Sequence, residues 1–180
     1  GSHVYNRALL ASIIANDGED EARKWTNGLV KNLARKPQGN DRAQAKAIYA
    51  GECDVALMNT YYYGKMKFNN KNPEQKNWAN SLSLVFLDQK GRGQHVNISA
   101  AAVLKASKKQ AAAVEFIEWL TSPEAQLLYT KVNYEYPVNP KVNPSKEVAS
   151  WGRFKIDEVS LTDIAKNTPL AQMIINETGW

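Results

Sequence analysis

Cysteine and histidine, two of the commonest metal ligands in proteins, are scarce in this sequence of 180 residues. Cys53 is the only cysteine, which excludes an internal disulfide and a zinc cluster built on cysteine. The two histidines, His3 and His95, lie too far apart in the sequence to form a local metal-binding motif. The patterns of zincins, zinc fingers, phosphate-binding loops and GxSxG hydrolases are absent. The sequence therefore carries none of the usual signatures of an enzyme.

Long apolar runs are also missing. No stretch approaches the roughly 18 apolar residues of a membrane span, and the start lacks the charged-then-apolar pattern of a signal peptide. Hydrophobic residues make up 43% of the chain and charged residues 23%. This balance excludes a disordered polyelectrolyte and predicts a soluble protein with one medium domain or a small two-lobed one.

The net charge of +5 comes from 23 basic and 18 acidic residues. Nucleic-acid binding requires lysine and arginine to be concentrated on one face, but here acids alternate with bases, as in residues 18–24. The aromatic and glycine motif of an RNA-binding sheet is absent. We therefore expect no nucleic-acid partner and attribute the basic residues to solubility.

Apolar periodicity predicts that helices and strands alternate in the first ninety residues, and that a further strand follows the break at residues 91–93. The predicted helices cover residues 7–15 (with Asn6 as N-cap), 19–36 (after Gly18), 41–50 (with Asp41 as N-cap), a segment that opens at residue 61, and 74–79. The predicted strands are short apolar or alternating runs at 54–58, 82–87 and 95–99. This alternation indicates the α/β class.

The second half of the sequence is predicted to be mainly helical. Ser107 begins a capping-box pattern, and Ser122 stands directly before a proline at a second helix start. The segment 134–140 is expected to be extended. The tail, 145–180, contains Pro169 and is predicted to form short helices.

Three consecutive tyrosines follow the apolar run at 54–58, in the sequence Asn59-Thr60-Tyr61-Tyr62-Tyr63. Ligands bind at the carboxyl ends of strands in open α/β sheets, so these side chains are candidates for a binding site. Phenolate is a hard anionic oxygen that suits a hard trivalent cation, although a free tyrosine loses its proton only with a pKa of about 10. Metal affinity would therefore fall as the pH falls. The residues alone leave open the simpler interpretation that the rings pack in an amphipathic helix.

Five motifs follow one another at consistent spacing over nearly the whole chain. They are Tyr5-Asn6 at a helix start, Gly51-Glu52-x-Asp54-Val55-Ala56-Leu57-x-Asn59-Thr60-Tyr61-Tyr62, Gly91-Arg92-Gly93-x-His95-Val96-Asn97-Ile98-Ser99, Ser122-Pro123-Glu124-Ala125-Gln126, and Asn133-Tyr134-Glu135-Tyr136-Pro137-Val138. Together they resemble the periplasmic ferric-ion-binding proteins, the substrate-binding components of bacterial iron(III) ABC transporters. The resemblance favours a metal site over simple packing of the tyrosines.

The resemblance implies an α/β, periplasmic-binding-protein-like fold of type II with a transferrin-like lobe, in which Fe(III) is bound in the cleft between two lobes. It implies that Tyr61 and Tyr62 are the central metal ligands and that Tyr5 supplies a further phenolate. Asn59 and Tyr63 are expected next to these ligands rather than on the metal. A bound anion is a further candidate ligand, although a tyrosine at position 5 argues against a required one.

The same resemblance assigns residues 1–94 to the C-lobe, 95–141 to a hinge strand and helices that pack on the N-lobe, and 142–180 to helices that return to the C-lobe. Family members have an N-terminal lobe and a signal peptide ahead of the segment that opens with Tyr5. We therefore expect a C-terminal fragment of an exported, periplasmic protein. Its expected partners are the missing N-lobe and an inner-membrane ABC permease.

Other hypotheses remain beside ferric-iron binding. The alternative function is a periplasmic binding protein for another small ligand, such as an organic anion or a sugar, although such sites favour aromatic stacking with arginine or asparagine. A tyrosine-based enzyme would need a titratable partner and a nucleophile, which the sequence does not offer, so no enzymatic activity is expected. A chain without its N-lobe is expected to bind iron weakly and to self-associate around residues 100–132.

Overall fold

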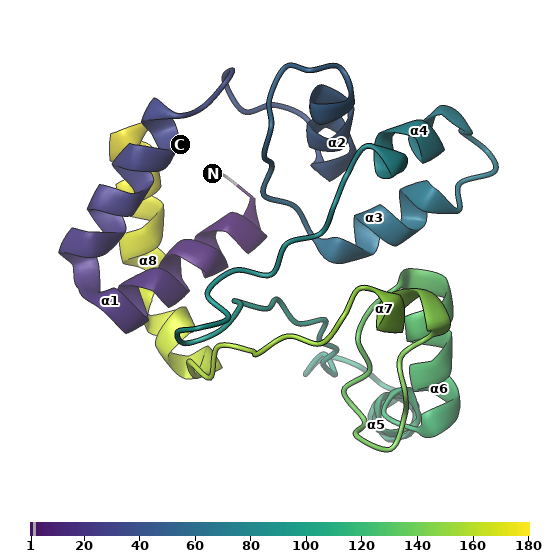
Figure 1. Ribbon diagram of the computed structural model, residues 1–180. Helices are drawn as coiled ribbons and strands as arrows, with labels where there is room; N and C mark the ends of the chain where they lie inside the picture. Colours follow the sequence, from purple (N-terminus) through teal and green to yellow (C-terminus); the bar gives the residue numbers. More distant parts are fainter. Residues whose placement is uncertain (2) are drawn as a thin grey trace. The chain divides into compact units, whose positions relative to one another are not determined.

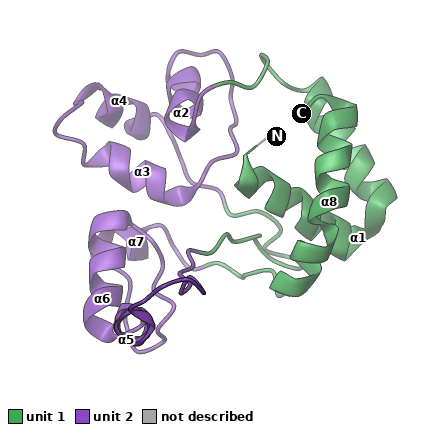
Figure 2. Ribbon diagram, turned by 180° about the vertical axis from the view of Figure 1, so that it is seen from behind, with its two compact units in different colours: residues 1–38, 86–98, 154–180 green, residues 39–85, 99–153 purple. Residues whose placement is uncertain are grey.

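The computed structural model describes residues 1 and 3–180, which form helices joined by irregular segments (Figure 1). The chain divides into two compact units (Figure 2): unit 1 comprises Gly1–Gln38, Phe86–Ile98 and Phe154–Trp180, and unit 2 comprises Gly39–Val85 and Ser99–Arg153. Each unit is therefore built from segments that are far apart in the sequence. The lobe boundaries expected at residues 94 and 141 refer to a longer protein and stay a prediction.

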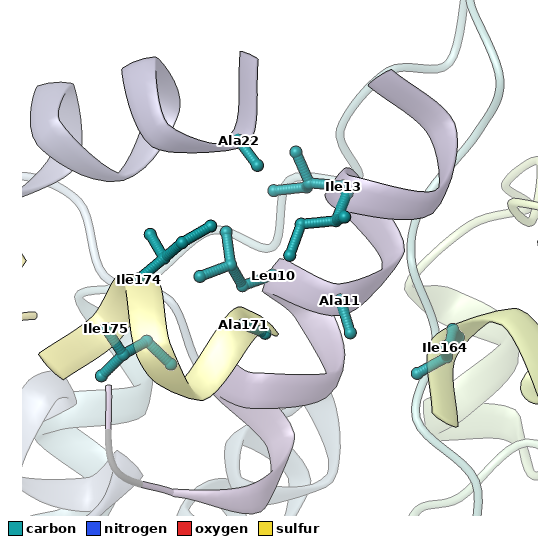
Figure 3. Close-up of a cluster of buried hydrophobic side chains, with 9 residues drawn as sticks. Leu10, Ala11, Ile13, Ala22, Ile164, Ala171, Ile174 and Ile175 are labelled. Atoms are coloured by element: carbon teal, nitrogen blue, oxygen red, sulfur yellow. The ribbon is translucent and has the colours of Figure 1, made fainter. Parts of the chain in front are cut away.

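Unit 1 is built on two long helices that pack against each other, α1 (Val4–Lys31) and α8 (Leu161–Thr178). Their contact is a cluster of buried apolar side chains from both helices (Figure 3), made up of Leu10, Ala11, Ile13, Ile14, Ala22, Ile164, Ala171, Ile174 and Ile175. Burial of each large aliphatic side chain contributes about 1.5–3 kcal/mol. This cluster therefore stabilises unit 1.

Helix α1 is interrupted at Gly18, whose backbone is not helical (φ 83°, ψ 171°). Glycine is the residue that adopts this region readily, because it has no Cβ. The predicted division into two helices at Gly18 is thus confirmed. The predicted N-cap, Asn6, is wrong: the cap is His3, whose Nδ1 accepts the backbone N–H of Tyr5 at 3.4 Å. The sequence pattern missed it because serine, threonine, aspartate and asparagine are the preferred N-caps.

The predicted short helices of residues 145–180 are confirmed only in part: α7 (Lys146–Ser150) is short, but residues 161–178 form one helix of 18 residues, α8. Pro169 lies inside it, although a proline in a helix interior removes a backbone hydrogen bond. The helix continues because Ile164 before the proline and Ile174 after it both lie in the core of unit 1. Despite the length of α1 and α8, no helix within residues 1 and 3–180 is long and apolar enough to cross a membrane.

Unit 2 begins with three short helices, α2 (Asp41–Tyr49), α3 (Thr60–Lys67) and α4 (Glu74–Asn80). These confirm the helices predicted from residues 41, 61 and 74. Their shared core consists of Ala45, Met66 and Ala79, one from each helix, all of which are buried. Small alanines on α2 and α4 allow the backbones to approach around the single large methionine of α3.

The second part of unit 2 contains α5 (Gln110–Leu120), α6 (Pro123–Leu128), a turn of π-helix η1 (Tyr129–Asn133) and α7 (Lys146–Ser150). Ser122 is the N-cap of α6, as predicted, and its Oγ accepts the Ala125 N–H at 3.3 Å. The capping box at Ser107 is wrong. Its Oγ accepts the N–H of Lys109, two residues on, at 3.2 Å, and α5 starts one residue later. A serine that binds the backbone locally in this way competes with a helix start.

Residues 1 and 3–180 contain no strand, so the strands predicted at 54–58, 82–87 and 95–99 are wrong. The β pairing in this part of the chain is an isolated parallel bridge between Gln94 and Ile156. An apolar segment becomes a strand only where a neighbouring segment pairs with its backbone N–H and C=O groups. Residues 54–58 and 82–87 have no such neighbour among the described residues, and Val55 and Val85 are 82% and 75% exposed.

We predict that Gly18→Ala destabilises the protein by about 1–3 kcal/mol, because alanine is strained in this backbone region. Gly28→Ala is the matched control, because Gly28 is helical and an added Cβ would meet no atom within 4 Å. The control substitution should stabilise the protein by about 0.5–1 kcal/mol. Urea unfolding followed by circular dichroism measures both changes. Equal effects of the two substitutions on the free energy of unfolding would contradict the claim that the backbone at position 18 requires glycine.

Candidate metal centre

Tyr61 and Tyr62 lie in the first turn of α3, which begins at Thr60 after the N-cap Asn59. Their ring centroids are 4.4 Å apart, the ring planes are inclined by 32°, and both residues are half-buried. Neighbouring helical residues project in directions that differ by about 100°, so contact between the two rings is not a consequence of helix geometry alone. The two tyrosines form one aromatic surface at the start of α3.

The start of α3 is fixed by a carboxylate from α2. Asp41 accepts the backbone N–H of Asn59 through Oδ1 at 2.7 Å, and the same oxygen lies 3.4 Å from Asn59 Nδ2. Asn59 makes no side-chain capping bond to α3. A hydrogen bond to an ionised group is stronger than one between neutral groups. Asp41 therefore positions the residue from which the tyrosine pair extends.

Each of the two tyrosines carries a cation over its ring. The guanidinium carbon of Arg42 is 4.7 Å from the Tyr62 centroid, and Nζ of Lys65 is 5.0 Å from the Tyr61 centroid. Such cation–π contacts contribute about 0.5–1 kcal/mol at exposed sites and more where the groups are desolvated. Arg42 and Lys65 therefore place a positive charge against the face of each ring.

Tyr63 differs from its two neighbours. It packs against the core formed by α2, α3 and α4, and its ring stands edge-on to Trp151 at 5.9 Å. Trp151 donates Nε1–H to Glu147 Oε1 at 3.0 Å. The same carboxylate pairs with Lys67 at 2.7 Å, and this hydrogen bond raises the pKa of Lys67. Helix α3 is thus joined to α7 on the side that carries Tyr63.

The backbone of α3 at Gly64 lies close to the ring of Tyr134. A Cβ at Gly64 would overlap the ring of Tyr134, so only glycine fits at this position of α3. Tyr134 itself has a left-handed backbone (φ 60°) at the end of η1, and its ring stacks on Phe68 with centroids 5.7 Å apart. Contacts along α3 therefore hold the helix whose first turn carries the tyrosine pair.

Tyr5 lies in unit 1, as the second residue of α1. Its ring is 4.7 Å from the imidazole of His3, and it is half-buried. Tyr61 and Tyr62 belong to unit 2. The structure thus brings two of the three predicted ligands together within one unit, and the participation of Tyr5 stays a prediction.

Other metal-ligating side chains do not gather elsewhere in the described residues. Within residues 1 and 3–180, no group of three or more histidine, cysteine, aspartate or glutamate side chains is placed to bind a metal ion. His95 lies in unit 1, where burial lowers its pKa and Nε2 lies 3.3 Å from Asn97 Oδ1.

The sequence analysis missed the two residues of α2 that contact the tyrosine segment, Asp41 and Arg42. Asp41 was predicted to cap α2, but Asn40 does so, with its Oδ1 accepting the N–H groups of Arg42 at 3.1 Å and Ala43 at 3.4 Å. Two adjacent residues of the preferred cap types are a signal that one of them is available for another contact. No local pattern indicates where Arg42 points.

Residues 4–156 match the family model described as bacterial extracellular solute-binding protein. The chain therefore belongs to this family, whose description indicates a periplasmic or extracellular location. The chain is similar to iron uptake protein A1 of Synechocystis sp. (strain ATCC 27184 / PCC 6803 / Kazusa), with 44% identity over 179 residues. This alignment spans 99% of the chain and 49% of the relative.

Two solved structures are also similar to the chain. The ferric binding protein from Campylobacter jejuni is 47% identical with a TM-score of 0.93, over 97% of this chain and 55% of that one. A Trichodesmium protein (IdiA, FutA), solved in complex with iron and citrate ligands, is 39% identical with a TM-score of 0.94, over 100% of this chain and 57% of that one. The predicted periplasmic-binding-protein-like fold is thus confirmed. The chain spans about half the length of the curated relatives it matches.

We predict that Asp41→Ala destabilises the protein by about 1–3 kcal/mol, because it leaves the Asn59 N–H without its partner. The amide of Asn59 should also exchange faster with deuterated water. Asp54→Ala, which removes an exposed carboxylate from the segment before α3, is the control and should change stability by less than about 0.5 kcal/mol. Urea unfolding and hydrogen exchange are the measurements. Unchanged exchange at Asn59 in Asp41→Ala would contradict the assigned contact.

Proposed function

We propose that this chain binds ferric iron as the substrate of an uptake system and that Tyr61 and Tyr62 are paired phenolate ligands of the metal. The observation that carries the proposal is the contact between the two rings at the start of α3, 4.4 Å apart, with a cation over each ring. Phenolate oxygens suit a hard trivalent cation. The names of the relatives, an iron uptake protein and a ferric binding protein, support the same ligand.

Binding replaces the proton of each phenol with the metal ion. Each ligand releases its hydroxyl proton as the oxygen–iron bond forms, so affinity falls as the pH is lowered and protons compete. Tyr5 is proposed to supply a third phenolate from unit 1. Asn59 and Tyr63 are proposed to act beside the metal: Asn59 by fixing the start of α3 and Tyr63 by packing the helix against its core.

The remaining coordination positions are proposed to be filled from outside this chain. Three phenolates leave positions open in the octahedral coordination common for oxygen ligands. An anion is one candidate, and the iron and citrate ligands of the Trichodesmium protein support it. The other candidate is a second lobe, because the relatives are about twice as long as this chain. This chain by itself should therefore bind iron more weakly than the longer relatives.

The protein is proposed to be a binding component without enzymatic activity, located in the periplasm. In the complete uptake system, two lobes would close around the ion by a hinge motion and present it to an inner-membrane ABC permease. Membership of a solute-binding family supports this assignment.

Titration with a ferric chelate tests the metal assignment. The chain should develop a visible phenolate-to-iron charge-transfer band, and Tyr61→Phe and Tyr62→Phe should each weaken binding by at least about tenfold, since each removes one metal–oxygen bond. Tyr49→Phe is the matched control, because Tyr49 is an exposed tyrosine on α2 and lies outside the pair. The control should leave the band and the affinity unchanged.

A colourless titration that is unchanged in Tyr61→Phe and Tyr62→Phe would contradict the metal assignment. Binding of a small organic anion or a sugar with no requirement for metal would then favour the alternative ligand class. An affinity that rises as the pH falls would contradict phenolate ligation even if a metal is bound.

Helix α5 is proposed to be the surface through which two copies of this chain associate. No residue of α5 is buried, and its exposed side chains include Val114, Phe116 and Trp119, of which the last two stack at 5.8 Å. An apolar surface of this kind is normally covered by a partner.

Size-exclusion chromatography with light scattering should show a concentration-dependent dimer. Phe116→Ser should shift the equilibrium toward the monomer, because it removes apolar area from the contact. Leu161→Ser, at an exposed leucine of α8, is the control and should leave the dimer fraction unchanged. A monomer at every concentration would contradict this proposal and would leave the metal assignment unaffected.

A further inference from the structure

We propose that Arg42 is a positioning residue for Tyr62 and holds the Tyr62 ring in the orientation that iron binding requires. The inference rests on the proposed function, because the orientation of Tyr62 matters only if its oxygen is a ligand. It is carried by a contact between two helices, in which the guanidinium of α2 lies over the ring of α3 at 4.7 Å.

Arg42 is itself held in place. Its Nε donates to Oε1 of Gln75 in α4 at 3.2 Å, and Gln75 is only 8% exposed. The same oxygen of Gln75 accepts a hydrogen bond from Nδ2 of Asn69 at 3.0 Å. The backbone of Arg42 is fixed as well, because its N–H donates to the N-cap Asn40 at 3.1 Å. The guanidinium thus has few alternative positions, which makes it suited to orienting a neighbouring ring.

Tyr62 has two ring contacts, with Tyr61 at 4.4 Å and with Arg42. A tyrosine hydroxyl is carried at the end of a rigid ring, so rotation of the side chain moves the oxygen by several ångströms. The contact with Arg42 links the pair to α2 and α4. Lys65, over Tyr61, lies in α3 itself and provides no such link between helices.

The planar shape of arginine is important for this role. A guanidinium stacks on an aromatic face while one of its N–H groups binds elsewhere, whereas a lysine ammonium on a flexible stem is a point charge. We therefore expect Arg42→Lys to retain only part of the effect and Arg42→Met to lose it. Lys46→Met is the matched control: Lys46 lies one turn later in α2 and places its Nζ 5.8 Å from the ring centroid of Trp78, away from the tyrosine pair.

Iron affinity, measured by competition with a chelator, should fall by about three- to tenfold in Arg42→Met, as expected for the loss of a partly desolvated cation–π contact. The charge-transfer band should shift in position, because the geometry at the Tyr62 oxygen changes. Arg42→Lys should lie between Arg42→Met and the parent chain, and Lys46→Met should equal the parent chain. A double-mutant cycle with Tyr62→Phe isolates the pair, and Arg42→Met should have no further effect in that background.

Aromatic NMR of the metal-free chain provides a readout that does not depend on iron. The Tyr62 ring signals, assigned by comparison with Tyr62→Phe, should shift in Arg42→Met and stay in place in Lys46→Met. A parent chain that shows no charge-transfer band would overturn the proposed function, and the inference about Arg42 with it, whatever the NMR result.

If the parent chain does show the band, two results would overturn the role of Arg42 alone. One is Tyr62 ring signals and an iron affinity that are unchanged in Arg42→Met. The other is a loss of iron affinity from Arg42→Met that is as large in the Tyr62→Phe background as in the parent chain. This result would mean that Arg42 acts through the packing of α2 on α4 rather than through Tyr62.

Discussion

The hydrogen bond from the Asn59 amide to the Asp41 carboxylate is the contact on which the candidate site depends. It joins the first residue of α2 to the residue just before α3, and so determines where the first turn of α3 begins. Arg42 follows Asp41 directly and contacts Tyr62, so a single turn of α2 contacts both the backbone and a side chain of the tyrosine segment. Helix α2 is in turn capped by Asn40, which fixes the direction in which both residues project.

Helix α3 has two faces with different roles. Tyr63 packs on the core of unit 2 and against Trp151, the backbone at Gly64 lies close to the ring of Tyr134 after η1, and Lys67 pairs with Glu147 in α7. Tyr61 and Tyr62 instead contact each other and two cations. A helix of only eight residues is marginal by itself, so these packing contacts make it a stable support for the two tyrosines that are proposed as ligands. This arrangement explains why three consecutive tyrosines need not have the same function.

The local signals in the sequence were sufficient where a single residue determines the backbone. Gly18 divides α1 and Ser122 caps α6, as their residue types predict. The signals failed where the outcome depends on a distant partner. The apolar segments 54–58 and 82–87 have the composition of strands, but no ladder of backbone hydrogen bonds pairs them with another segment among the described residues. Asp41 and Asn40 are equally good caps in sequence, and only the approach of Asn59 distinguishes them. The position of Tyr61 and Tyr62 at a helix start was predictable, whereas the cations over their rings were not.

The most direct test of the central claim, that Tyr61 and Tyr62 bind one ferric ion together, is the location of iron by anomalous X-ray diffraction at the iron absorption edge, in crystals of the chain grown with a ferric chelate. The predicted result is a single anomalous peak within bonding distance of both tyrosine hydroxyl oxygens, at the start of α3. A peak bound to only one of these oxygens, or an iron ion located away from α3, would contradict the account.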